Sequence, residues 1–269
     1  MTATSEVVAS ASIRVSSDPG VQYLLRIGDT CLVMAQRLAE WSGRAPTLEE
    51  DIALSNTGLD LLGQARGVLT RAGQLEAGRG GDAHDEDQLA FLRDERDYRN
   101  LTLVELPRGD FAVTVLRNFL MATFLKQLWH RLAASGDAEL AGVAVKAVKE
   151  ATYHQEHAAD WVVRLGDGND ESIARMNAAL DQLWPYTVEM FESDAVDDAA
   201  ARSKLGPRWA DLRASWQAEV DEVFGEAGLE VPKPRPFRST GKSGRHSEHL
   251  GYILAEMQHL QRTFPGGTW

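Results

Sequence analysis

Residues 110–135, DFAVTVLRNFLMATFLKQLWHRLAAS, carry the pattern that decides the fold. Apolar side chains recur in it every three or four positions, at Phe111, Val115, Phe119, Leu120, Phe124 and Leu128. This spacing is typical of a helix that buries one face. Because no proline occurs between Pro107 and Pro185, the chain can form long helices without interruption here. The stretch predicts a helix over about 110–135, which Gly136 and Asp137 separate from another over about 138–165.

Residues 20–73 predict a second pair of helices. Residues 20–43 have apolar side chains at the same three-and-four spacing, and Thr47-Leu-Glu-Glu50 has the form of a capping box that begins the next helix. Two such αα-hairpins pack into a four-helix bundle. Further helices are expected at about 85–99, 170–192, 207–225 and 246–263. The predicted fold is therefore all-α, with a four-helix bundle core built of two αα-hairpins and additional C-terminal helices.

Composition limits the classes of function. The chain has 269 residues, with 40 acidic and 28 basic side chains and a formal net charge of −12. This balance disfavours an extended nucleic-acid surface or an anionic-membrane surface, since both need a basic face. The single cysteine, Cys31, excludes an internal disulfide framework, fits a buried core position, and suits a reducing, cytoplasmic location.

The chain reads as one domain with two irregular segments. Residues 1–18 are small and polar, lack the apolar core of a signal peptide, and predict a flexible N-terminal tail. Residues 19–269 predict a single helical domain. Within it, residues 229–245 form an extended arm that is rich in proline and glycine. The basic side chains of this arm are Lys233, Arg235, Arg238, Lys242 and Arg245.

A four-helix bundle raises the question of a metal site. Bundles of the ferritin-like class hold two metal ions through one Glu from each of two helices and a Glu-x-x-His from each of the other two. In the first hairpin, Asp29 and Asp60 are spaced to face each other, but Gly63 stands where the histidine is expected. In the second hairpin His154 supplies an imidazole, but Ala151 stands where the glutamate is expected. The remaining carboxylate position falls at Arg117 or Asn118, so only three of six expected ligands survive in type.

Each candidate also has a structural interpretation. Asp29 and Asp60 could equally be solvated positions on amphipathic helices. Glu150, His154 and His157 share one helical face and could hold an adventitious ion, although a helix histidine is more often simply hydrogen-bonded or exposed. Asp194, Asp197 and Asp198 are expected in a solvated loop rather than in a magnesium site.

Long colinear blocks of the chain resemble the C subunits of bacterial phenylacetyl-CoA epoxidase. The blocks are RLAEW at 37–41, LEEDIAL at 48–54, LDLLGQAR at 59–66, AFLRDERDYRN at 90–100, VELP at 104–107, HAADWVVRLGDG at 157–168, LWPY at 183–186 and LAEMQ at 254–258. The resemblance as a whole extends from about residue 20 to the C-terminus, where Pro265, Gly266 and Trp269 also match. The resemblance is therefore more specific than any single metal motif.

The resemblance implies a ferritin-like fold and a place in a multicomponent monooxygenase that epoxidises the ring of phenylacetyl-CoA. It implies that the A subunit holds the di-iron centre, that the C subunit is its structural partner, and that a separate reductase with flavin and an iron–sulfur cluster supplies electrons from NADPH. This chain is then expected to be a non-catalytic subunit without a cofactor of its own, with a homodimer as one option when it is alone. The alternatives are an active di-metal oxygenase subunit with unusual ligands and an unrelated helical scaffold or binding protein.

Two hypotheses about charged residues follow. If Asp29 and Asp60 are buried without metal, they need a cation, and Arg117 on the facing helix is the candidate that would bind both carboxylates. The basic arm at 229–245 is either a solvated connector or a contact with an acidic partner surface or with the phosphates of coenzyme A.

Overall fold

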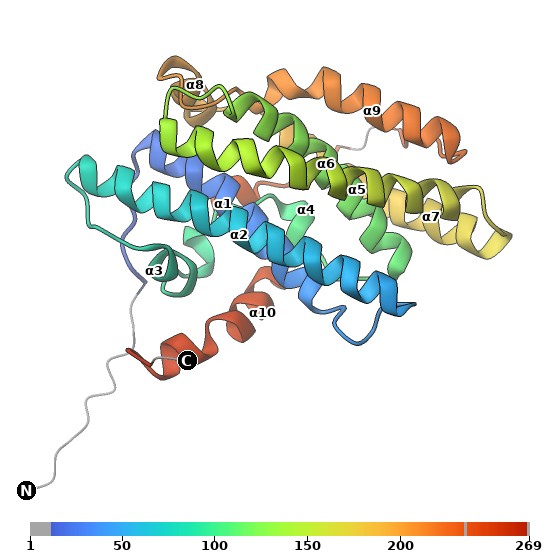
Figure 1. Ribbon diagram of the computed structural model, residues 1–269, viewed down its shortest axis with the longest axis horizontal. Coiled ribbons are helices and arrows are strands. Elements are labelled where there is room, and N and C mark those ends of the chain that lie inside the picture. The colour runs from blue at the N-terminus through green and yellow to red at the C-terminus, as the bar shows by residue number, and fades with distance from the viewer. Residues whose placement is uncertain (1–11, 234–235, 268–269) are drawn as a thin grey trace, which may run out of the picture.

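The computed structural model describes residues 12–233 and 236–267, and this part of the chain is built of helices (Figure 1). Four long helices form its body: α1 (Pro19–Ala39), α2 (Leu48–Gly78), α5 (Phe111–Leu132) and α6 (Ala138–Gly166). Within the described ranges no strand forms, and the one β-bridge joins Thr240 to Arg245. The all-α prediction is confirmed.

The long helices pair as the sequence predicts. The α1–α2 hairpin and the α5–α6 hairpin lie side by side, with α2 against α6 (Figure 1). Contacts between α2 and α6 run antiparallel, since Arg71 bonds Asp137 near one end and Glu50 lies beside His157 at the other. Two αα-hairpins packed in this way make the ferritin-like four-helix bundle.

Local signals set the ends of the long helices. Asp18 precedes Pro19, the first residue of α1, and its side chain accepts hydrogen bonds from the backbone N–H groups of Gly20 and Val21. The Thr47 side chain caps α2 by accepting a hydrogen bond from the backbone N–H of Glu50. Asp110 and Asp137 cap α5 and α6 in the same way. A side-chain oxygen at each start satisfies backbone N–H groups that have no partner within the helix.

Shorter elements complete the fold. They are α3 (Glu86–Phe91), η1 (Glu95–Asp97), α4 (Thr102–Glu105), α7 (Asp170–Leu183), η2 (Trp184–Phe191), α8 (Ala195–Arg202), η3 (Trp209–Leu212), α9 (Arg213–Glu226), η4 (Gly241–Ser243), α10 (Glu248–Met257) and α11 (His259–Thr263). The single helix predicted over 85–99 is wrong, because the chain leaves α3 at Leu92 and turns into the bundle. The loop predicted around Asp194 is also wrong, because Asp194 and Asp197 form a capping box that begins α8.

Large aromatic side chains fill the space between the bundle and its C-terminal helices. Trp209 and Trp216 are fully buried together with Phe119, Phe124 and Phe224. Phe124 meets Trp209 edge-on, with ring centroids 5.1 Å apart. Burial of aromatic surface of this size contributes strongly to holding α9 and η3 onto α5.

The described end of the N-terminal segment does not behave as the predicted flexible tail. The backbone N–H of Ile13 donates to the Leu92 carbonyl at 3.2 Å, and that of Ser16 donates to the Glu76 carboxylate at 2.6 Å. Residues 12–18 are thus fixed against α2 and the segment after α3. The rest of the predicted tail, residues 1–11, lies outside the described residues.

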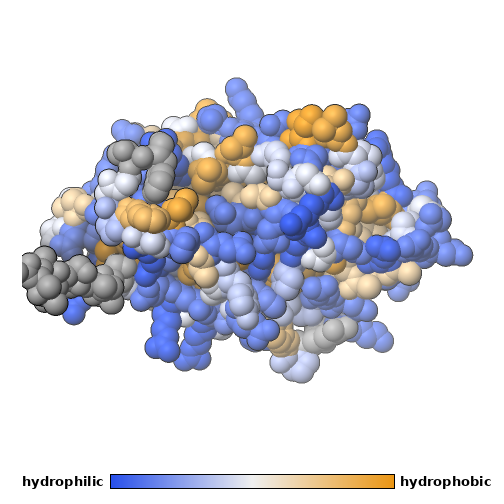
Figure 2. Space-filling model, turned by 90° about the horizontal axis from the view of Figure 1, so that it is seen from below, coloured by the Kyte–Doolittle hydropathy of each residue, from blue (hydrophilic) through white to orange (hydrophobic). Residues whose placement is uncertain are grey.

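The face shown in Figure 2 is mostly hydrophilic, and apolar side chains gather on it in separate patches. No helix of the described part is both long and apolar enough to span a membrane.

Candidate functional site

The centre of the bundle is the place where a ferritin-like protein would hold metal. All four long helices reach it, and its lining is largely apolar. The lining includes Met34, Thr57, Leu61, Asn118, Ala122, Leu125, Ala151, His154, His157 and Ala158. The space left at this centre is about 10 Å³, which is room for about one water molecule. Side chains therefore fill the centre themselves.

One imidazole and one carboxylate meet at the edge of this centre. His154 Nε2 lies 3.1 Å from Asp60 Oδ2, with the His154 side chain buried and that of Asp60 40% exposed. Burial lowers the pKa of His154, and the nearby Asp60 carboxylate offsets this only in part. The imidazole is therefore neutral at neutral pH, and Asp60 keeps much of its hydration. Of the two open interpretations of Asp60, the structure therefore favours the partly solvated one, and the condition that both Asp29 and Asp60 are buried is not met.

A layer of side-chain hydrogen bonds around Gln64 lies beside the centre. Gln64 on α2 accepts from the indole of Trp129 at 3.2 Å and donates to Glu150 at 3.0 Å. Cys31 lies 3.8 Å from the same Gln64 oxygen, and burial raises the pKa of its thiol. Gln64 and Trp129 have no place in a metal-ligand pattern, so a pattern of carboxylates and histidines in the sequence does not reveal them.

The donor set at the centre does not fit a di-iron site. Such a site needs carboxylates from all four helices together with two imidazoles. Of the predicted positions, Ala151 and Asn118 face the centre without a carboxylate, and Gly63 lies exposed on the outer side of α2. Within residues 12–233 and 236–267, no three histidine, cysteine, aspartate or glutamate side chains are grouped so as to hold a metal ion. His154 and His157 contact separate carboxylates, Asp60 and Glu50.

Comparison with known proteins identifies the family. The family model described as "Phenylacetic acid catabolic protein" matches residues 6–269. The chain is 49% identical over 247 residues to the C subunit of 1,2-phenylacetyl-CoA epoxidase from Escherichia coli (strain K12), covering 92% of this chain and 98% of that protein. This chain belongs to the phenylacetic acid catabolic protein family. The resemblance seen in the sequence blocks is confirmed.

In this family member Asp29 has a different partner from the one predicted. Its carboxylate is fully buried and accepts hydrogen bonds from both terminal nitrogens of Arg93, with a distance of 2.9 Å from Nη1 to Oδ2. It also accepts a hydrogen bond from the backbone N–H of Arg99 at 2.8 Å. The Arg93 guanidinium also lies over the ring of Tyr98, 4.4 Å from its centroid. The block at 90–100 thus forms a clasp on α1. Asp29 pairs with Arg93, whereas Asp60 pairs with His154.

The hypothesis that Arg117 replaces a metal charge between Asp29 and Asp60 is wrong. Arg117 is buried on α5, but its guanidinium points to the turn before that helix and donates to the carbonyls of Leu106, Pro107 and Arg108. Burial, together with the nearby positive charge of Arg37, lowers the pKa of Arg117 to about 10. Arg117 therefore fixes the α4–α5 connection.

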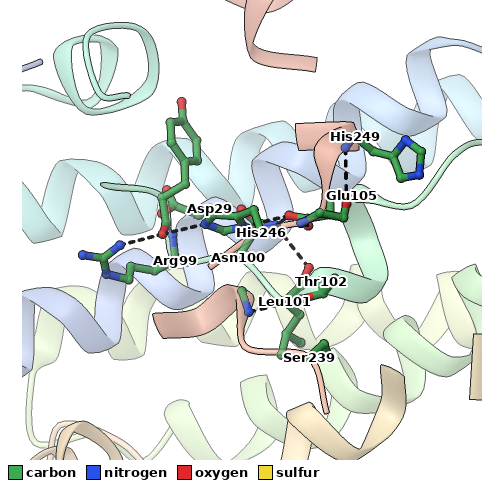
Figure 3. Close-up of polar contacts among 12 residues, drawn as sticks. Asp29, Arg99, Asn100, Leu101, Thr102, Glu105, Ser239, His246 and His249 are labelled. Atoms are coloured by element: carbon green, nitrogen blue, oxygen red, sulfur yellow. Dashed lines mark hydrogen bonds and ion pairs between the residues drawn. The ribbon is translucent and has the colours of Figure 1, made fainter. Parts of the chain in front are cut away.

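A buried polar network joins the clasp to the C-terminal segment (Figure 3). Glu105 accepts from Asn100 at 2.9 Å, from the backbone N–H of Ser247 at 2.5 Å, and lies 2.8 Å from His246 Nδ1. Burial alone would lower the pKa of His246, but the hydrogen bond and charge of Glu105 outweigh it and raise the pKa. One carboxylate thus holds the chain before α10 onto α4.

The basic arm is partly built into the protein. Lys242 is buried, its ammonium lies 3.7 Å from the Asp197 carboxylate, and its backbone N–H donates to Glu189. The prediction that Lys242 contacts a partner or coenzyme A is therefore wrong. Arg238 pairs with Glu192 at 2.9 Å and stays half exposed. Lys233 and Arg245 are exposed. Arg235 lies outside the described residues.

The acidic residues at the start of α8 serve the same packing. Arg26 on α1 bonds Asp194 at 2.5 Å and lies 3.4 Å from the fully buried Asp197. Burial alone would raise the pKa of Asp194, but Arg26 holds it down at about 2. Burial raises the pKa of Asp197, which Lys242 and Arg26 only partly counter. These carboxylates anchor α8 to α1, and the predicted solvated loop is wrong for Asp197.

Proposed function

We propose that this chain is a non-catalytic, structural subunit of phenylacetyl-CoA epoxidase. In this proposal it pairs with the di-iron A subunit and stabilises it, within a cytoplasmic complex that a separate NADPH-dependent reductase supplies with electrons. The proposal assigns no cofactor to this chain. Two observations together support the proposal. The chain is 49% identical to a C subunit of this epoxidase, and the residues at its bundle centre do not fit a di-iron donor set.

The physical reason lies in what a bundle centre needs. Metal ligation requires converging carboxylates, which are costly to bury without the ion. Here alanine, asparagine and methionine occupy the centre, so the bundle is stable through packing and neutral hydrogen bonds. A protein of this kind offers a rigid helical body to a partner, and its own core needs no metal.

Co-expression with the A subunit of the same organism, followed by iron analysis, tests the proposal. We expect a stable complex whose iron matches one di-iron centre per A subunit, and no stoichiometric iron in this chain alone. His154→Gln and Asp60→Asn are expected to leave the iron content and the epoxidation rate of the complex unchanged. Stoichiometric iron in the isolated chain, lost in these variants, would support the alternative of an active di-metal subunit.

We extend the proposal to the exposed part of the basic arm. Lys233 and Arg238 border a surface hollow of about 220 Å³ whose floor includes Trp184 and Trp216. Their charge suits an acidic partner surface or the phosphates of coenzyme A. Reversing both charges is expected to weaken assembly or the affinity for the coenzyme A ester. If neither changes, the arm is a solvated connector.

A further inference from the structure

Residues 246–264 form a C-terminal strap, made of α10, α11 and the residues beside them, that is fastened to the clasp. Figure 1 shows α10 at the edge of the molecule, outside the four long helices. Three apolar side chains of the strap, Leu250, Ile253 and Leu254, are buried, whereas Tyr252 is 73% exposed. A surface hollow of about 370 Å³ lies between the strap and η1. The apolar packing that holds the strap is therefore small beside the aromatic core that holds α9 onto α5.

Polar side chains supply the rest of the attachment. The last carbonyl groups of a helix have no partner within it, and here the strap bonds the carbonyls at and just after the end of α3. Gln258 Nε2 lies 3.1 Å from the carbonyl oxygen of Ala90 and 3.0 Å from that of Arg93. Arg262 donates to the carbonyls of Phe91 and Arg93 at 3.1 Å and 2.9 Å. A segment with few buried apolar contacts and hydrogen bonds at the protein edge opens more readily than the core.

His246 begins the strap, and each of its two ring nitrogens faces an acceptor oxygen (Figure 3). Nδ1 lies 2.8 Å from a carboxylate oxygen of Glu105, and Nε2 lies 3.1 Å from the carbonyl oxygen of Tyr98. The His246 and Glu105 side chains are 1% and 0% exposed. A neutral imidazole has one N–H, so its other nitrogen would place a lone pair against an oxygen that cannot donate. Only the imidazolium donates at both positions. The attached strap therefore selects protonated His246.

The other charges around His246 do not reverse this preference. Asp29 on α1 also favours the imidazolium, although Arg93 pairs with that carboxylate. The Arg99 guanidinium in the clasp bonds backbone carbonyls, including that of Tyr98. The charged or titratable neighbours of His246 on the strap and on η1 are Arg245, Glu248, His249, Glu95, Arg96 and Asp97. Burial alone would lower the pKa of His246, but contact with Glu105 outweighs it and raises the pKa.

We infer that the C-terminal strap is a pH-sensitive closure, which stays on the clasp while His246 is protonated and opens, with the four-helix bundle still folded, when His246 loses its proton. The proton passes to solvent, and in the open form water replaces the bonds to Glu105 and to the carbonyls after α3. Because the pKa of His246 is raised in the closed form, closure is strongest below the ordinary histidine pKa and weakens as pH rises through the raised value.

Hydrogen–deuterium exchange of the full chain, read by mass spectrometry at about pH 5.5 and about pH 8, tests this inference. The rates are corrected for the direct effect of pH on amide exchange. We expect the protection of the α10 amides to fall by about threefold or more between the two pH values. The α5 amides are expected to stay better protected than those of α10 at both, because the strap opens without unfolding of the bundle.

Three variants separate the pH-sensitive group from the attachment. His246→Gln carries no charge, so its α10 amides should be less protected than those of the wild type at about pH 5.5 and should change little with pH. Gln258→Leu removes bonds to the clasp, so it should lower the protection of α10 at both pH values and keep the pH dependence. His130→Gln is the matched control, because His130 is exposed on α5, and it should behave as the wild type does.

A measurement on the wild type alone keeps the test valid if a variant does not fold. Nuclear magnetic resonance of the histidine ring nitrogens is expected to show His246 titrating with a midpoint above the ordinary value of about 6.5. A midpoint at or below that value overturns the inference, as does α10 protection that is equal at the two pH values or that keeps its pH dependence in His246→Gln. If α10 and α5 lose protection together and to the same level, the pair stabilises the whole chain and no separate strap opens. None of these results bears on the proposed function, which does not depend on the strap.

Discussion

Replacing Arg93 with methionine tests how much the clasp, which holds the segment at 90–100 onto α1, contributes to the stability of the chain. The Arg93 and Asp29 side chains are both fully buried, and Arg93 also donates to the carbonyls of Leu89 and Asp97. Arg93→Met leaves the Asp29 carboxylate in the interior, where the backbone N–H of Arg99 still donates to it but no cation neutralises it directly. Removing one partner of a buried pair costs about 3–5 kcal/mol of unfolding free energy.

The double variant Asp29→Asn with Arg93→Met makes the test sharper. It removes the uncompensated charge, so we expect it to be more stable than Arg93→Met alone by about 1–2 kcal/mol. Urea unfolding of the full chain, followed by circular dichroism, gives the free energies and the coupling between the sites.

A surface pair provides the control. Arg66 is 75% exposed and pairs with Glu86 at 3.1 Å, so Arg66→Met is expected to cost at most about 0.5 kcal/mol. The reasoning is refuted if Arg93→Met costs no more than Arg66→Met, or if the double variant costs the sum of the two single changes.

Three further predictions concern other buried groups. Glu105 raises the pKa of His246, so the pair stabilises the fold fully below the ordinary histidine pKa, and this stabilisation is lost as pH rises through the raised value. His246→Gln should therefore lose more unfolding free energy at about pH 5.5 than at about pH 9. Equal losses at the two pH values in urea unfolding would contradict this. Arg117→Lys replaces the planar guanidinium, whose two terminal nitrogens reach the three carbonyls, with a single nitrogen; it should lose about 1–3 kcal/mol of unfolding free energy, with faster proteolysis at the turn before α5 as the readout. Gly63→Ala should stabilise the chain by about 0.5–1 kcal/mol, because the added Cβ meets nothing within 4 Å. Gly73→Ala should instead lower the thermal midpoint markedly, because its Cβ would lie 1.8 Å from a backbone carbonyl oxygen. Equal effects of the two changes would argue against this packing.

The long helices could be predicted from the sequence because their signals are local. Three-and-four spacing, gaps between prolines, and caps such as Thr47 and Asp137 act within a few residues of each helix end. The predicted helix over 110–135 is observed as Phe111–Leu132, and that over 138–165 as Ala138–Gly166. Elements that depend on distant contacts do not show in such local patterns; one is α4, which packs against α1 and η2.

The directions of charged side chains could not be predicted in the same way. α1 is buried on nearly all sides, so periodicity does not tell which side of Asp29 faces the bundle centre. Its true partner, Arg93, lies 64 residues away in a segment that the sequence predicts as a charged helix. The sequence places Lys242 in a surface arm for a similar reason, because only the folded chain reveals the buried Asp197 and Glu189 that receive it.

The sequence alone determined the fold class, the hairpin arrangement and the family, because each rests on patterns that run along the chain. It also determined that carboxylates are missing at Asn118 and Ala151, since residue type is independent of geometry. Tertiary structure decided which cation neutralises Asp29, that Asp60 stays half exposed beside His154, and that Gly63 faces outward into a groove. These depend on how helices rotate and pack against one another, which is set by the summed burial of many distant side chains.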